Sequence, residues 1–291
     1  MFCLRRVSTK MKVNHASSRF VIRVLSPGLL LLLLIAPTVS ARRGGKQDKP
    51  LTAEQVVERA LSAYGGRPAI YVIQKNGILR ANIKLITANG VLDGRMVSKF
   101  IRKPKLSEDL LTIELDLPEM KYSITTDGKE VWSTENGQPH KPSEQEIRGF
   151  RGSHEHHYEA LLRYKENESK LEYTGSNKIG TLDLDQIRLT SKDGVVTLYE
   201  ISRRTGRIIY VNYEEKQEKG DSMVKYRLYF KDFRVIQNTI IPYEVQVFQN
   251  GKLIEERKIV EAAFNVQMEE KIFKSATPSK AEEPKESKEP K

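Results

Sequence analysis

Apolar and polar residues alternate one by one along much of the stretch from Thr181 to Phe264. Alternate side chains of a β-strand point to opposite faces, so this pattern predicts strands with one apolar and one solvated face. Charged and polar residues such as Lys225, Arg227, Glu244 and Gln246 separate the apolar positions. In the two clearest runs the apolar positions are Val224, Tyr226, Leu228 and Phe230, then Ile241, Tyr243, Val245 and Val247.

Short pairs containing glycine separate these predicted strands. Glycine accepts the positive φ that tight hairpins require, so the stretch is predicted to be a series of antiparallel hairpins. Between Asp183 and Ile187 the alternation slips by one residue, which predicts a β-bulge that bends the sheet. The turn pairs are Asp193-Gly194, Thr205-Gly206, Lys219-Gly220 and Asn250-Gly251.

The amino-terminal half shows the same alternation, from Leu79 to the Asn136-Gly137 pair, with further turns at Asn89-Gly90 and Asp127-Gly128. No linker separates the two halves. We therefore predict a mainly β domain with a few helices, in which both halves belong to one antiparallel sheet. A sheet with one apolar face needs a cover, and the helices are the candidates.

Two regions have helical rather than strand periodicity. Thr52 and Gln55 have capping-box spacing and Gly65-Gly66 follows, which predicts a helix over 52–64 and a second short turn from Pro68. The apolar stripe of the first helix predicts that it is a lid over an apolar surface. Ser143 and Glu146 have the same spacing at the start of 143–165, where Gly149 and Gly152 predict a break into two pieces.

Net charge does not favour a nucleic-acid-binding protein. The formal charge is +11, from 49 basic and 38 acidic residues. Six of the basic residues lie in the first 41 positions, which hold no acidic residue, and without those six the charge is +5. That is the surface of an ordinary soluble domain. The single cysteine, Cys3, lies in the same segment, so the mature chain is predicted to have no disulfide or cysteine metal site.

The ends of the chain are predicted to be an export signal and a tail. Basic residues precede the apolar run of 29–35, and Val39-Ser40-Ala41 resembles a cleavage site, so residues 1–41 are interpreted as a signal peptide. An uncleaved amino-terminal anchor is the alternative, and Met1 or Met11 is the start. Residues 42–50 are predicted to be a flexible leader, 51–274 a single domain, and 275–291 a disordered charged tail.

The strongest candidate for a catalytic or metal-binding site is the segment His154-Glu155-His156-His157. His154 and His157 share a helical face, but Tyr158 stands where the metal-binding pattern H-E-x-x-H requires its second histidine. We interpret this segment as a polar surface helix start, and we predict no metal, no cofactor and no enzyme activity. The sequence also lacks the glycine-rich phosphate-binding and nucleophile-elbow motifs.

Several segments resemble the periplasmic lipoprotein-sorting carriers of the LolA/LolB-like superfamily. The likeness covers about residues 51–273 and rests on loose motifs at 60–66, 161–164, 171–175, 230–234, 240–245, 250–252 and 263–265. It implies an open antiparallel half-barrel whose concave apolar face is covered by helices. Members of that family hold acyl chains while they cross the periplasm. The resemblance implies no particular site residue in this chain.

We predict that one set of alternating apolar residues faces an acyl-chain cavity and that Val57 and Leu61 belong to its lid. A closed, dry core is the alternative, because alternation alone does not distinguish a filled core from a cavity. The predicted cavity residues are Leu79, Ile83, Met96, Phe100, Ile113, Leu115, Tyr226, Leu228, Tyr243 and Val245.

The sequence therefore favours an exported, periplasmic carrier of lipid or lipoprotein that has no catalytic activity. Its expected partners are acyl chains, with transient membrane contact and no nucleic acid. An envelope assembly or scaffold protein that binds other envelope proteins is the second interpretation. A hydrolase that uses scattered residues, including His154 or His157, is the third.

Overall fold

The computed structural model describes residues 51–216 and 222–275. The predicted export signal, leader and charged tail (apart from Ser275) lie outside these residues, as does the Lys219-Gly220 turn. The helices are α1 (Ala53–Ala63), α2 (Gly66–Tyr71), α3 (Glu144–Glu155) and α4 (Tyr158–Leu162), with 3-10 turns η1 (Ile73–Lys75), η2 (Leu106–Glu108) and η3 (Glu270–Phe273). Within the described ranges, no helix has the length and apolarity of a bilayer span.

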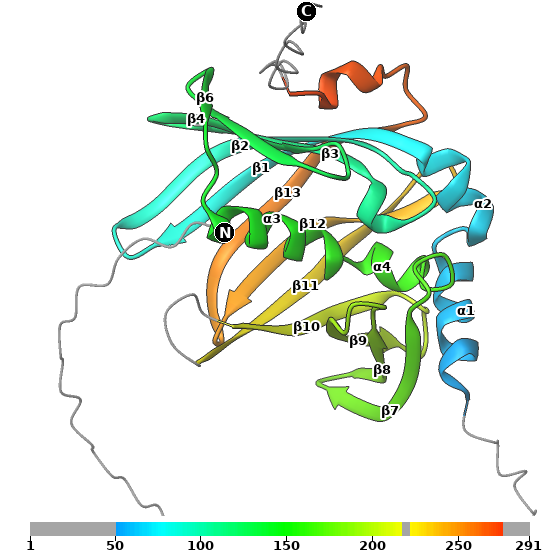
Figure 1. Ribbon diagram of the computed structural model, residues 1–291. Helices are drawn as coiled ribbons and strands as arrows, with labels where there is room; N and C mark the ends of the chain where they lie inside the picture. Colours follow the sequence, from blue (N-terminus) through cyan, green and yellow to red (C-terminus); the bar gives the residue numbers. More distant parts are fainter. Residues whose placement is uncertain (1–50, 217–221, 276–291) are drawn as a thin grey trace, which may run out of the picture. The chain divides into compact units, whose positions relative to one another are not determined.

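Thirteen strands form one antiparallel sheet that does not close into a barrel, which confirms the predicted fold class (Figure 1). The strand order is β6-β5-β4-β3-β2-β1-β13-β12-β11-β10-β9-β8-β7. The strands are β1 (Asn76–Thr87), β2 (Gly90–Ile101), β3 (Leu110–Leu117), β4 (Met120–Thr126), β5 (Val131–Glu135), β6 (Gln138–His140), β7 (Lys170–Ile179), β8 (Leu182–Thr190), β9 (Val196–Ser202), β10 (Ile208–Lys216), β11 (Met223–Ile236), β12 (Thr239–Gln249) and β13 (Lys252–Phe264).

The last strand in the sequence occupies the centre of the sheet. β13 is the seventh of the thirteen strands and joins β1 to β12, so it connects the amino-terminal half (β1–β6) to the carboxy-terminal half (β7–β12). Figure 1 shows α3 and α4 inside the curve between the two halves, while α1 and α2 lie at one end of the curve. η3 packs on the opposite face of the sheet, where Phe273 contacts Ile101 and Leu110.

Local sequence signals explain most boundaries. Thr52 and Gln55 form the predicted capping box of α1, and Ser143 and Glu146 form that of α3. At the β12–β13 turn, Asn250 and Gly251 have φ values of 48° and 77°, which is the geometry of a tight hairpin. The β11–β12 turn has the same geometry at Gln237 and Asn238, although it contains no glycine.

Two local predictions need correction. The extra residue of the bulge is Thr174 on β7, because Tyr173 pairs with Ile187 and Gly175 with Gln186. Strand β8 itself pairs with β9 without a register shift, so Leu184 and Ile187 point to opposite faces of the sheet and the slip in the apolar pattern is not a bulge. Gly149 and Gly152 do not break the helix, because α3 continues through both and ends at Glu155. At Gly152 an added Cβ would lie 2.5 Å from Glu215 Oε1, so a larger residue there would displace the flexible end of the Glu215 side chain.

Candidate functional site

The concave face of the sheet is apolar along nearly all of its strands, but its two halves are covered differently. Directly opposite residues in antiparallel strands share a face. By this rule the carboxy-terminal half presents Tyr226, Leu228 and Val245 to the same interior as Ile83 of the amino-terminal half. The ten predicted cavity residues thus share one face, although the structure divides them among several packing clusters.

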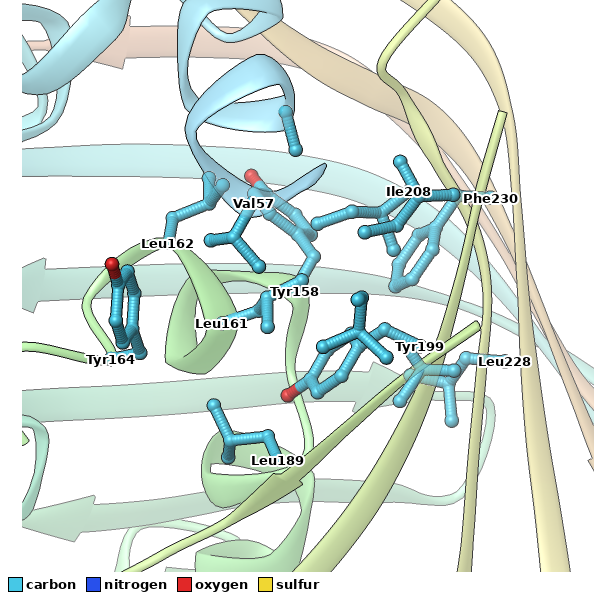
Figure 2. Packing of buried hydrophobic residues seen from close by; sticks show 14 of the residues in the cluster. Val57, Tyr158, Leu161, Leu162, Tyr164, Leu189, Tyr199, Ile208, Leu228 and Phe230 are labelled. Carbon is cyan, nitrogen blue, oxygen red and sulfur yellow. The ribbon is translucent and has the colours of Figure 1, made fainter. Parts of the chain in front are cut away.

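The carboxy-terminal half is a closed core. Val57 and Leu61 of α1 pack in one cluster with Tyr226, Leu228 and Val245, and all five are at least 92% buried. Figure 2 shows side chains from α1, α4 and the strands that belong to this cluster. The labelled side chains in that view are Val57, Tyr158, Leu161, Leu162, Tyr164, Leu189, Tyr199, Ile208, Leu228 and Phe230.

The other predicted residues are packed away from α1. Ile83 and Met96 are buried together with parts of Ile113 and Leu115, and Tyr243 packs with Leu79 and Phe100. The structure therefore brings Val57 and Leu61 together with three of the ten predicted cavity residues and not with the other seven. Helix α1 therefore covers only the carboxy-terminal half of the concave face.

Four predicted cavity residues in the amino-terminal half are only half-buried. They are Leu79 on β1, Phe100 on β2, and Ile113 and Leu115 on β3. Phe150 of α3 is the buried helical residue that packs against this region. Met120 and Ile259 are half-buried beside them. This half of the concave face thus leaves apolar surface accessible under α3, and Phe150 is a contact that the sequence analysis did not identify.

The junction between α3 and α4 contains the histidine cluster. His154 Nε2 lies 3.2 Å from Asp109 Oδ2, and the buried His156 is hydrogen-bonded through Nδ1 to Thr197 Oγ1 at 2.7 Å. His157 caps α4. The prediction of a polar surface helix start was therefore wrong, because tertiary packing draws these residues into the domain. Among the described residues, no group of three or more His, Cys, Asp or Glu side chains is placed to hold a metal ion.

Comparisons with known proteins identify the fold. No family model matches the sequence, and no curated protein matches it. Three solved structures are similar to this protein. Each match covers 76–78% of this chain and 97–99% of the chain in the solved structure. They are a DUF1329 family protein from Desulfovibrio piger (TM-score 0.55, 11% identity), an outer membrane lipoprotein-sorting protein domain from Vibrio parahaemolyticus (0.53, 14%) and a LolA superfamily protein from Nitrosomonas europaea (0.51, 14%).

The domain has a LolA-like fold. The resemblance seen in the sequence is thereby confirmed for the architecture. At these identities the likeness describes the fold alone.

Two buried arginines attach α4, and with it the α3–α4 junction, to the sheet of this LolA-like fold. Arg163 is fully buried and donates to both carboxylate oxygens of Asp109, at 2.5 and 3.1 Å, and to the carbonyl of Lys103 at 2.6 Å. Arg102 pairs with Glu159 and donates to the carbonyls of Ile70 and Gln74. Burial opposes the charge of Glu159, but the Arg102 guanidinium lowers its pKa to about 2. These pairs make the junction a fixed part of the core.

A cavity of about 1330 Å³ in the LolA-like domain is lined mainly by residues of α3 and of strands β8 to β11. Pairing of β10 with β9 ends at Asn212–Leu198, whereas pairing with β11 continues to Lys216–Met223, and this step lets the cavity touch both faces of the sheet. Its lining combines six basic and three acidic side chains with apolar ones such as Ile179, Leu198 and Phe248. Tyr226 is the one predicted cavity residue that lines it.

His156 makes the stability of the domain depend on pH. Its ring stacks on Tyr213 with centroids 3.8 Å apart, and burial lowers its pKa from 6.5 to about 4. Between these values the unfolded chain binds a proton that the folded chain excludes. The stabilisation is therefore complete above pH 6.5 and is lost as the pH falls toward 4.

Between pH 7 and pH 5 the titration of His156 is expected to cost the original protein about 2 kcal/mol of stability. We expect His156→Phe to abolish this pH-dependent loss. Phe keeps a ring against Tyr213 but does not titrate. Urea unfolding at both pH values measures the difference. An equal loss of stability in the variant and the original protein would contradict the assignment, and Thr197→Val controls for the lost hydrogen bond.

Proposed function

We propose that the protein is an exported, non-catalytic carrier that binds the acyl chains of lipids or lipoproteins while they cross the periplasm. The LolA-like fold supports this proposal, since two of the solved structures that share it are named for lipoprotein sorting or for the LolA superfamily. The basic and apolar pattern of residues 1–41 supports export.

The observation that carries the proposal is the accessible apolar surface under α3. Leu79, Phe100, Ile113 and Leu115 point into the curve of the sheet but keep part of their surface accessible. Burying a methylene group is worth about 0.8 kcal/mol, so an acyl chain laid on this surface gains stabilisation with each carbon that it shields. The ligand region that we propose therefore lies in the amino-terminal half, away from α1.

A binding experiment with a neutral apolar dye, Nile red, tests this location. Ile113→Asp puts a charge in the middle of the proposed surface, and we expect it to weaken dye binding by about tenfold or more, because a carboxylate is costly to desolvate. Fluorescence titration at neutral pH provides the dissociation constant.

The control is Val97→Asp. Val97 is also half-buried and lies on β2, but it is opposite Arg80 and Glu114 and so faces the outer side of the sheet. We expect this variant to bind the dye as the original protein does. Equal weakening by both substitutions would place the effect on the fold rather than on the concave surface and would contradict the proposed site.

Extraction of the protein from its native host, followed by mass spectrometry, tests the function itself. Lipid or acylated protein recovered with the carrier supports the proposal. An envelope protein recovered without any acyl ligand would contradict it and would favour the scaffold interpretation.

A further inference from the structure

A pair of opposite charges lies in the middle of the apolar concave face. Arg257 and Glu255 are two residues apart on β13, the central strand, and they form an ion pair. Arg257 lies directly opposite Ile83 on β1 and Val245 on β12. Glu255 lies opposite Leu85 and Val247 in the same way. Both charged side chains therefore project into the interior that the apolar residues form.

Charges are expensive at such a position unless they are well paired. Arg163 and Arg102 meet that condition, since each donates to a carboxylate and to backbone carbonyls. Arg257 does not. In the described part of the chain its ion-pair partner is Glu255, and its Nε is buried without a hydrogen-bond partner. The Arg257 guanidinium thus keeps donor capacity that the protein itself does not use.

The side chains around Arg257 are partly accessible. The side chains of Arg257, Glu255 and His157 are 24%, 20% and 30% exposed although they lie between the sheet and the α3–α4 junction. Burial lowers the pKa of His157 to about 4; the charge of Glu159 opposes that lowering, and the charge of Arg257 adds to it. An anion that entered this space would meet a guanidinium with free donors, and guanidinium groups bind carboxylate and phosphate groups with two parallel hydrogen bonds.

We propose that Arg257 binds the oxyanion head group of an acyl ligand whose chain lies on Phe100, Ile113 and Leu115. This inference rests on the proposed carrier function and narrows its ligand class to acyl chains with a carboxylate or phosphate head. From β13 to β3 there are three strand spacings, about 14 Å, which the chain of a fatty acid spans. An acyl chain joined to a protein by a neutral ester or amide lacks the charge that Arg257 recognises.

The test compares three ligands with the same twelve-carbon chain: dodecanoate, dodecyl phosphate and dodecanol. Each is titrated against the purified protein with bound Nile red, and displacement of the dye reports affinity. We expect the original protein to bind at least one of the anions more tightly than the alcohol. Arg257→Met is expected to weaken binding of that anion by about ten- to a hundredfold and to leave the affinity for dodecanol unchanged. Loss for only one anion identifies the head group.

Glu255→Gln is expected to change the affinity for the anion in the opposite direction. It removes the acid that competes for the guanidinium, so we expect severalfold tighter binding of the anion and no change for dodecanol. Arg80→Met is the matched control, because Arg80 pairs with Glu261 on the outer face. We expect it to leave all three affinities unchanged.

Three results would overturn the inference: Arg257→Met retains the preference for the anion, it weakens all three ligands equally, or Glu255→Gln fails to tighten anion binding. If the original protein binds dodecanol but no anion more tightly, the head-group site fails while the carrier function stands. If it binds none of the three ligands, the carrier function itself fails.

Discussion

Replacing Arg163 with methionine is expected to lower the free energy of unfolding by about 3–5 kcal/mol, since removal of one partner from a buried ion pair leaves the other charge buried and unpaired. Here the remaining charge is Asp109, which is 97% buried and would keep a contact with His154. The carbonyl of Lys103 would also lose a donor. Methionine preserves most of the side-chain length, so the effect reports the charge.

Urea unfolding at pH 7, followed by circular dichroism, measures the change. Arg80→Met is the control, because the Arg80–Glu261 pair is exposed and such pairs are worth at most about 1 kcal/mol. A loss below 1 kcal/mol for Arg163→Met would show that the Arg163–Asp109 pair does not hold the α3–α4 junction in place.

Leu61→Ala is expected to lower the free energy of unfolding by about 2–5 kcal/mol, the usual cost of a cavity at a buried leucine. Leu61 is 2% exposed and packs in the closed cluster with Val57, Tyr226 and Leu228. A loosely held lid would tolerate the change much better, because its contacts would already be exchanged for solvent or ligand during opening.

Chemical denaturation and dye binding together test this assignment. Leu51→Ala, at a position that is 42% exposed just before α1, should change stability by less than about 0.5 kcal/mol. We expect Leu61→Ala to bind Nile red as the original protein does at temperatures where it remains folded. Small destabilisation combined with stronger dye uptake would instead identify α1 as a movable cover.

The elements of this fold could be predicted because their signals are local. One-residue alternation marks β11 and β12, the Thr52–Gln55 and Ser143–Glu146 pairs mark two helix starts, and Asn250-Gly251 marks a hairpin. The β11–β12 turn at Gln237 and Asn238 carries no glycine and was not recognised. Its residues take positive φ because the paired strands on both sides determine the turn.

The site was harder to predict because it depends on contacts between distant segments. Alternation assigns Ile113 and Leu228 to apolar faces but does not say that α1 covers one half of the sheet and α3 the other. The order of strands places β13 beside β1, which no local pattern indicates. Arg257 could have been found from its own strand, since it has the same parity as Ile259 and therefore faces inward.

The central position of β13 has a consequence for biogenesis. Strands β1–β6 and β7–β12 can each pair with sequence neighbours, but in the described sheet the two sets of strands are connected through residues 252–264. A nascent chain therefore has no complete sheet until nearly all of the domain has been synthesised, and its contacts between distant residues form late.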